Sequence, residues 1–405
     1  MKDSDKLEAY FGLPKEVRFC SSCVISNQRP NSTVEFMNQR GEKKKTIGFA
    51  DNGICDACTY QKEKAHQIDW KMREDQLVET LDKFRRKDGS YDVVVPGSGG
   101  KDSAYTSHIL KYRYGMNPLT VTWAPHLYTD IGWKNFTSWI HEGGLDNILL
   151  TPNGRLHRLL TRLAFKNLLH PFQPFIVGQR IIGPAMAQKY GVQLVMYGEN
   201  QAEYGNDPKD NFKPTMDTKF FSSQDPMEMV LGGEVVGDIM RDYNYPLNAF
   251  MPYIPPTSDS LAKSKIEVHY LGYYLPWDPQ ECYYYAVENT GFSANPERTP
   301  GTYSKYSSID DKIDMFHYYT TLIKFGIGRA TYDAAQEVRN GKITREEAVH
   351  LVRKYDQEFP KNHYSDFLKY IEISDTEFWE TVDRFRSPHL WKQGRNGWEL
   401  RHVVE

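Results

Sequence analysis

The sequence predicts an α/β protein in which a parallel sheet carries the functional site, with a cysteine-rich module before it and a helical region after it. From Tyr91 to about residue 205, short apolar runs alternate with segments of helical periodicity. Such alternation is typical of parallel strands covered by helices on both faces, with ligands bound beyond the carboxyl ends of the strands. Four of the five cysteines lie in two close pairs near the start of the chain, and helical spacing dominates from residue 301 onward.

The length of 405 residues fits two or three domains. Between Asn206 and Thr257, proline and glycine break the periodicity, and loops of that length are typical of lids or binding insertions. We therefore divide the chain into a zinc-knuckle module at 1–64, a linker helix at 65–90, an α/β domain at 91–205, a loop-rich substrate-binding insertion at 206–300 and a helical region at 301–405 that completes the active site.

The composition excludes several classes of partner. A net charge of −3 lacks the positive excess of nucleic-acid-binding proteins, so we expect no nucleic-acid partner. No apolar run approaches the eighteen residues that a membrane span needs, and the first residues are polar, so we expect neither a membrane contact nor a secretory signal. The expected location is cytoplasmic, where cysteines stay reduced.

The two cysteine pairs have the spacing of metal-binding knuckles. Cys20 and Cys23 form one C-x-x-C pair, and Cys55 and Cys58 form the other after 31 intervening residues. Four thiolates would fill the tetrahedral shell of one Zn²⁺, so the expected metal is structural. Redox-active dithiols and unliganded cysteines are the alternatives.

A helix is expected from about Ala65 to Arg86, after the cysteine module. Its inward residues would be Ile68, Met72, Leu77, Leu81 and Phe84.

The α/β domain begins with the first of four expected strands. These strands are Val93–Val95, Leu119–Trp123, Asn147–Leu150 and Gln193–Tyr197. Two strand ends carry informative residues, because Trp123 closes the second strand and Gly198-Glu-Asn200 follows the fourth. We expect both to lie near a ligand at the sheet's carboxyl edge, although each is also compatible with an ordinary turn.

A loop of small residues, Pro96-Gly-Ser-Gly-Gly-Lys-Asp-Ser103, joins the first strand to a helix. It is not a Walker A loop, because Val95 stands where the first glycine belongs and Asp102 follows Lys101. It is not the dinucleotide fingerprint either, since Asp102 occupies the third glycine position. Glycines and a helix N-terminus favour phosphate, so the candidate binding residues are Ser98, Gly99, Gly100, Lys101, Asp102 and Ser103. A tight turn without a ligand is the alternative.

The helical hairpin from Arg155 to Tyr190 carries a run of basic residues, namely Arg155, Arg158, Arg162, Lys166 and Arg180. Such a run is usually a solvated face, and a docking strip for phosphate or carboxylate is the alternative. Cys282, with no other cysteine near it, is interpreted as a packing residue. Capping boxes at Thr344 and Ser374 predict the starts of two late helices.

Ser98-Gly-Gly-Lys-Asp-Ser103 resembles the pyrophosphate loop of the PP-loop ATP pyrophosphatases, whose α/β domain is HUP-like. With the cysteine pairs, Gly198-Glu-Asn200, and the blocks 308–314 and 324–330, the chain resembles the N-acetyl sugar amidotransferases of bacterial surface-polysaccharide and nonulosonic-acid biosynthesis. The resemblance implies that ATP adenylates the amide oxygen of an N-acetyl group on a sugar, which we expect to be nucleotide-linked. Ammonia would then displace AMP to leave an acetamidino group.

The resemblance also implies roles for individual residues. The loop would bind pyrophosphate, Lys101 would neutralise charge, and Asp102 would hold Mg²⁺, with helix capping as the alternative for Asp102. Glu199 would assist the metal or orient substrate, and Arg329 would bind phosphate or sugar. The remaining expected nucleotide or sugar contacts are Trp123 near adenine, Gly198, Asn200 and Lys324.

The same resemblance implies that ammonia comes from a separate glutaminase through a cyclase-like subunit, because the chain shows no glutaminase motif. A tRNA sulfur transferase is the leading alternative, but it would need a catalytic cysteine and a basic surface. A nucleotide-binding scaffold without turnover is the other alternative.

Overall fold

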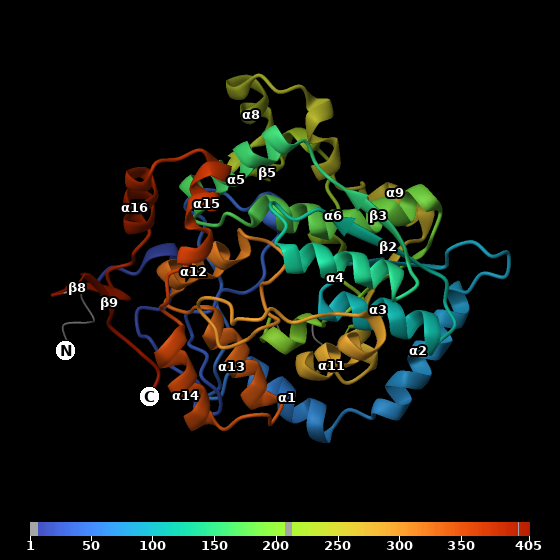
Figure 1. The fold of residues 1–405 in the computed structure, drawn as a ribbon, viewed down its shortest axis with the longest axis horizontal. Coiled ribbons are helices and arrows are strands. Elements are labelled where there is room, and N and C mark those ends of the chain that lie inside the picture. Colours follow the sequence, from blue (N-terminus) through green and yellow to red (C-terminus); the bar gives the residue numbers. More distant parts are fainter. Residues whose placement is uncertain (1–6, 207–212, 396) are drawn as a thin grey trace.

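The computed structural model describes residues 7–206, 213–395 and 397–405. A five-stranded sheet forms its centre, in the order β3-β2-β1-β4-β7, and every pairing in it is parallel (Figure 1). The strands are β1 (Val93–Pro96), β2 (Pro118–Trp123), β3 (Asp146–Leu150), β4 (Leu194–Tyr197) and β7 (Glu267–Tyr270). The four strands expected from the sequence are confirmed, and the fifth comes from the segment that was expected to be an insertion.

Side-chain alternation along the strands divides the core into two layers. Val94 and Val195 pack with α5 (Gly154–Leu168) and α6 (Gln173–Tyr190) on one face. Val93 and Val95 pack on the other face with α2 (Trp70–Phe84), α3 (Lys101–Tyr112) and α11 (Pro279–Thr290). Because both faces are covered, the free edge for ligands is the carboxyl end of the strands.

The expected linker helix at 65–90 is interrupted. The structure has α1 (Asp56–His66) and α2, and the Asp69 side chain caps α2 by accepting a hydrogen bond from the backbone N–H of Met72. Leu77, Leu81 and Phe84 are buried as expected, but Met72 is 50% exposed. The prediction that Met72 points inward was wrong, because the Asp69 cap starts a second helix and so determines which of its faces is buried.

The segment from 206 to 300 contains short elements as well as loops. They are β5 (Val230–Leu231), β6 (Glu234–Val235), α8 (Val236–Tyr243), α9 (Ser258–Ser264) and α10 (Leu271–Tyr274) in addition to β7 and α11.

Short 3-10 helices also occur along the described chain. They are η2 (Tyr10–Gly12), η3 (Glu35–Met37), η4 (Gln201–Tyr204), η5 (Thr218–Phe220), η6 (Pro226–Glu228), η7 (Leu247–Tyr253) and η8 (Lys361–His363).

The last hundred residues are mainly helical and lie together at one side of the sheet, coloured orange to red in Figure 1. The helices are α12 (Asp314–Phe325), α13 (Arg329–Arg339), α14 (Arg345–Tyr355), α15 (Tyr364–Ile371) and α16 (Asp375–Arg384). The capping boxes at Thr344 and Ser374 are confirmed. A hairpin of β8 (Trp391–Gly394) and β9 (Gly397–Leu400), which the sequence did not predict, follows them.

α4 (Asp130–His141) packs beside α3 and α11 through Trp139, Ala104 and Ala286. Among the described residues, no helix combines the length and apolar character that crossing a bilayer requires.

Candidate active site

The small-residue loop lies where the strand order of the sheet changes direction. From β1 the chain builds β2 and β3 on one side, and it then returns to place β4 and β7 on the other. The loop after β1 and the Gly198-Glu-Asn200 segment after β4 therefore meet at the carboxyl edge, which is the usual ligand crevice of such sheets.

Close packing explains why the loop needs glycine at two positions. A Cβ on Gly97 would lie 2.1 Å from Cβ of Ser103. Gly99 has a φ of +82°, and a Cβ there would lie 2.7 Å from Cα of Phe136 on α4. Ser103 Oγ donates to the carbonyl of Gly100 at 3.0 Å, which folds the loop onto the first turn of α3. The result is a rigid loop at a helix N-terminus, where anions are favoured.

Lys101 and Asp102 form an ion pair at the start of α3, with 2.6 Å between Lys101 Nζ and Asp102 Oδ2. Although burial opposes it, this pairing with Asp102 raises the pKa of Lys101, so the lysine stays charged. The other carboxylate oxygen, Asp102 Oδ1, is buried without a hydrogen-bond partner in the described structure. Gly100 is the N-cap of α3 and no side chain caps it, so the capping alternative for Asp102 is wrong.

Glu199 faces the loop from the end of β4. Burial, followed by repulsion from Asp102, raises the pKa of Glu199 to about 7, while a hydrogen bond from Tyr204 opposes the shift. A carboxyl group with this pKa can hold or release a proton near neutral pH.

Acidic residues from the C-terminal region close the site. Ser98 Oγ donates to Asp310 Oδ2 at 3.0 Å, so the loop is bonded directly to the 308–314 block. Arg329, at the start of α13, pairs with Asp333 at 3.0 Å. Burial raises the pKa of Asp314 to about 7, with Arg329 opposing that shift. Sequence reasoning singled out the block that holds Asp310 and Asp314 but gave neither residue a role.

Two cavities flank the loop and share the side chains of Ser98, Asp102 and Glu199. The acidic cavity, about 390 Å³, is also lined by Asp310 and Arg329. Its described lining carries eight acidic side chains, from Asp102, Glu199, Asp278, Asp310, Asp311, Asp314, Asp333 and Glu337, against the cations Lys101 and Arg329. The loop cavity, about 340 Å³, is lined by Gly97, Gly100, Ser103, Arg180 and Gly198 as well.

A third cavity of about 660 Å³ adjoins the loop cavity, and the two share Ser32, Gln201, Met216 and Tyr270. We call it the lysine cavity because Lys43, Lys45, Lys213 and Lys219 line it. Glu42 and Asp217 are the acids in its described lining, so its charge is opposite in sign to that of the acidic cavity.

Three of the expected contacts do not reach these cavities. Trp123 is 3% exposed, and its ring packs on Gly178 and Tyr253 in the core. Lys324 is buried and donates to the carbonyl of Leu168 at 2.6 Å, because Gly326 turns the chain between it and Arg329. The Asn200 side chain is buried and accepts from the backbone N–H of Ala202. We therefore correct the expected nucleotide or sugar contacts of Trp123, Lys324 and Asn200.

The basic run of the α5–α6 hairpin is divided between two roles. Arg158 and Arg162 both pair with Glu372, and Lys166 pairs with Glu377, so these members dock the C-terminal region. Arg180 is the member that lines the loop cavity.

The four expected cysteines meet in one buried cluster, with their Sγ atoms all within 4.8 Å of one another. The Sγ atoms are 3.8 Å apart for Cys20 and Cys58 and 3.9 Å apart for Cys23 and Cys55. Backbone N–H groups of Ser22, Cys23 and Cys55 point at Cys20 Sγ. This donor set fits a four-coordinate metal ion that binds thiolates.

A buried ion pair connects the cysteine cluster to the site. α1 begins after Cys55, and its Lys64 donates to Glu203 Oε1 at 2.7 Å and to the carbonyl of Trp277. Glu203 lies in η4, which begins at Gln201, directly after Glu199 and Asn200. The cluster thus anchors the helix that holds the segment carrying Glu199.

Comparison with known proteins bears on the C-terminal region. Residues 300–404 match the family described as the C-terminal domain of WbpG-like lipopolysaccharide (LPS) biosynthesis proteins. That part of the chain is therefore similar to this C-terminal domain, and we call it the WbpG-like region. This WbpG-like region supplies Asp310, Asp314 and Arg329 to the acidic cavity. A search of curated proteins found no match.

Two solved structures align over most of the chain at low similarity. NMN synthetase from Francisella tularensis is 14% identical with a TM-score of 0.29, and the alignment covers 71% of this chain and 97% of that one. The U34-tRNA thiolase NcsA from Methanococcus maripaludis, solved with its 4Fe-4S cluster, is 11% identical with a TM-score of 0.31, covering 78% and 88%. The strand order of the parallel sheet establishes the α/β fold class.

Proposed function

We propose that the chain is an ATP-dependent amidotransferase that converts an N-acetyl group of a nucleotide-linked sugar to an acetamidino group. The observation that carries this proposal is the bond between Ser98 of the loop and Asp310 of the WbpG-like region. It joins a phosphate-binding geometry to a domain type associated with lipopolysaccharide biosynthesis.

ATP would place its phosphates on the loop. The backbone N–H groups of Gly99 and Gly100, the N-terminus of α3 and the charged Lys101 all favour anions there. Lys101 would neutralise the charge that develops on the departing pyrophosphate.

Mg²⁺ fits the same place, because Asp102 Oδ1 is a buried oxygen without a partner among the described residues. Asp102 would hold the ion, with Glu199 assisting, and the ion would neutralise phosphate charge when bound.

The acidic cavity would hold the reacting amide. An amide carbonyl is a poor electrophile, so its oxygen must first become a leaving group, which adenylation achieves. Arg329 would stabilise the adenylate phosphate from the WbpG-like side. The site must also exclude water, because water would hydrolyse the activated group.

The lysine cavity would take the nucleotide carrier of the sugar. Its four lysines outnumber its two described acids, which suits the diphosphate of a nucleotide-linked sugar. Because this cavity adjoins the loop cavity, a sugar attached to that diphosphate can extend toward Ser98.

Ammonia would come from a separate glutaminase through a cyclase-like subunit, and the enzyme would work in the cytoplasm. The cysteine cluster would hold one structural Zn²⁺.

The test is to incubate the purified chain with ATP, Mg²⁺, ammonium and a panel of nucleotide-linked N-acetyl sugars. We expect AMP, pyrophosphate and a sugar product lighter by the difference between oxygen and NH. A non-catalytic scaffold would release no pyrophosphate. A requirement for tRNA and a sulfur donor would instead support the alternative of a tRNA sulfur transferase, although Cys282, the cysteine outside the cluster, is only 2% exposed.

A further inference from the structure

His317 on α12 has no role in the proposal above, yet it lines the acidic cavity together with Phe172. Its Nδ1 atom is buried and has no hydrogen-bond partner in the described structure. Among the described residues that line this cavity, the buried acceptors without a partner are Asp102 Oδ1 and His317 Nδ1. Asp102 is paired with Lys101 at the phosphate loop through its other oxygen. His317 Nδ1 is therefore the unpartnered acceptor that lies away from the loop, on α12.

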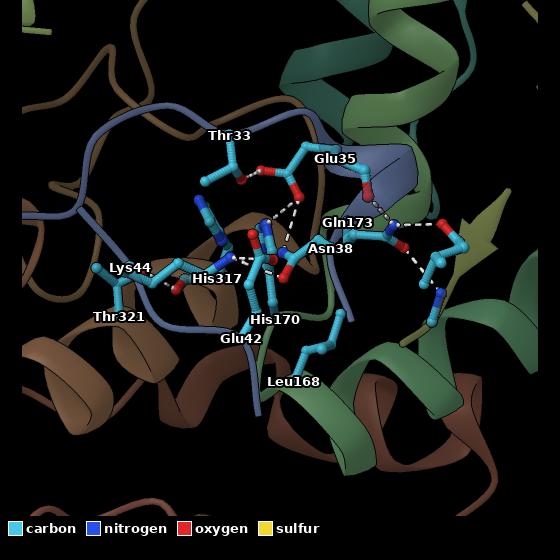
Figure 2. Close-up of polar contacts among 12 residues, drawn as sticks. Thr33, Glu35, Asn38, Glu42, Lys44, Leu168, His170, Gln173, His317 and Thr321 are labelled. Atoms are coloured by element: carbon cyan, nitrogen blue, oxygen red, sulfur yellow. Dashed lines mark hydrogen bonds and ion pairs between the residues drawn. The ribbon is translucent and has the colours of Figure 1, made fainter. Parts of the chain in front are cut away.

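The ring of His317 is held in place by stacking. It stacks on the ring of His170, with 4.9 Å between the centroids and 28° between the planes, and on that of Phe172 at 5.3 Å and 24°. Figure 2 shows His317 and His170 side by side, with Glu35 beyond His170. His170 Nε2 is 3.6 Å from Glu35 Oε2.

Glu35 comes from the segment between the two cysteine pairs and is kept as a carboxylate. Burial opposes ionisation, but His170, Lys44 and a hydrogen bond from Asn38 lower the pKa of Glu35 to about 2. Thr33 also donates to it at 3.3 Å. The module at the N-terminus thus supplies a fixed negative charge behind the pair of histidines (Figure 2).

The groups around His317 favour its neutral form. Burial lowers the pKa of His317 most, and His170, Arg329 and His126 lower it further, while Glu35 opposes them. A neutral imidazole at neutral pH can accept a proton.

We propose that His317 accepts the proton that the attacking ammonia must lose. The inference rests on the proposed amidotransferase function. The nitrogen lone pair forms a bond to the activated amide carbon, and the bond from that carbon to the adenylate oxygen breaks with its electrons, releasing AMP. The new nitrogen is left with a surplus proton, which passes to the His317 ring. His170 and Glu35 are positioning residues, since they act through His317.

The test separates activation of the amide from its amination. With His317→Gln in the full chain, we expect pyrophosphate release in the first turnover within about twofold of the natural chain and amidine formation reduced about 100-fold, the low end for general base catalysis. His350→Gln, on the exposed side of α14, is the matched control and should change neither rate.

Every outcome of this experiment decides the inference. In the first turnover, an unchanged ratio of amidine to pyrophosphate in His317→Gln overturns it, and so does an equal fall of both, which would indicate a structural role. If the natural chain itself releases no pyrophosphate with any sugar, the proposed function fails, and the inference fails with it.

A pH profile at constant free ammonia supplies a readout that a structural role would not change. His317 works unprotonated, so amidine formation should fall as pH drops through its lowered pKa. Glu35→Gln removes the charge that raises this pKa, so this step of the profile should move to lower pH. His317→Gln should abolish this step and leave any change near pH 7 that comes from Glu199 and Asp314. An identical step in all three proteins would contradict the role of His317.

Discussion

Gly99 shows how strongly the loop depends on a single residue. Its φ of +82° lies in the region that favours glycine, and the backbone of Phe136 leaves no room for a side chain. Since Phe136 belongs to α4, the loop is shaped by a helix more than thirty residues away in sequence. No local sequence pattern predicts that contact.

We predict that Gly99→Ala destabilises the chain by at least about 1 kcal/mol from the backbone conformation alone and weakens ATP binding. Gly154→Ala is the control, because nothing lies within 4 Å of the added Cβ and φ is not positive. Urea unfolding and ATP titration measure the two effects. Equal stability of the two variants would contradict this explanation of the loop.

Glu199 lowers the free energy of unfolding by an amount that depends on pH. Its pKa is raised from 4.5 to about 7, so the folded chain is penalised above pH 7, and the penalty disappears below pH 4.5, where the carboxyl is protonated in both states. We predict that, without Mg²⁺, Glu199→Gln stabilises the chain at pH 8 by at most about 3 kcal/mol and gives no gain at pH 4. Urea unfolding at both pH values checks the sign, and a gain at pH 4 alone would contradict it.

At the scale of elements, α1 transmits the order of the cysteine cluster to the site. Its Lys64 is almost fully buried and pairs with Glu203, which is also buried. Removing one partner would leave a buried charge unpaired, so we predict that Lys64→Met destabilises the chain by about 3–5 kcal/mol.

The double variant Lys64→Met with Glu203→Gln should recover part of that loss, because no charge is then left unpaired. Lys71→Met is the control, since its pair with Asp75 is exposed. Urea unfolding of the four proteins measures the difference. A loss in Lys64→Met no larger than in Lys71→Met would contradict the role of the pair.

The geometry of the cysteine cluster predicts that the chain binds one metal ion. We expect one Zn²⁺ per chain by elemental analysis and no visible absorption, because zinc with four thiolates is colourless and structural. Stripping the metal should unfold α1 and reduce pyrophosphate release together. Iron with visible absorption would contradict the zinc assignment.

At the scale of the whole molecule, the charge is divided between cavities on either side of the loop cavity. The acidic cavity is lined by eight acidic side chains, whereas the lysine cavity is lined by four lysines, although the net charge of the chain is only −3. Composition alone hides this separation, because the residues involved come from five separate parts of the sequence, at 43–45, 102, 199–219, 278 and 310–337.

We predict that Lys43→Glu combined with Lys45→Glu raises the KM for the nucleotide-linked sugar about tenfold or more and leaves the KM for ATP unchanged. Lys369→Glu, exposed on α15 and outside these cavities, is the control. Steady-state kinetics with each substrate varied in turn measures the effect. A rise in the KM for ATP instead would place the nucleotide of ATP in the lysine cavity.

Much of the fold could be predicted because its signals are local. The first strand contains the β-branched run Val93–Val95, and the strand before Gly198 is a short apolar run. The caps at Thr344 and Ser374 are fixed by residues three apart. The four cysteines could be paired because their spacing limits the possibilities.

The rest of the site depends on distant contacts. Asp310 reaches Ser98 across 212 positions, and His317 reaches the acidic cavity only because α12 packs beside the α5–α6 turn. Lys324 and Arg329 are close in sequence but separate in space, since Gly326 ends α12 between them. Sequence spacing therefore misplaced Lys324, whereas Arg329 does line the cavity.

The most direct test of the proposed chemistry follows the amide oxygen. A nucleotide-linked sugar with a heavy oxygen isotope in its N-acetyl carbonyl is turned over with ATP and ammonium, and the AMP is analysed by mass spectrometry. Adenylation of the amide oxygen predicts that the label appears in the phosphate of AMP in proportion to the amidine formed. Unlabelled AMP alongside amidine would contradict the account.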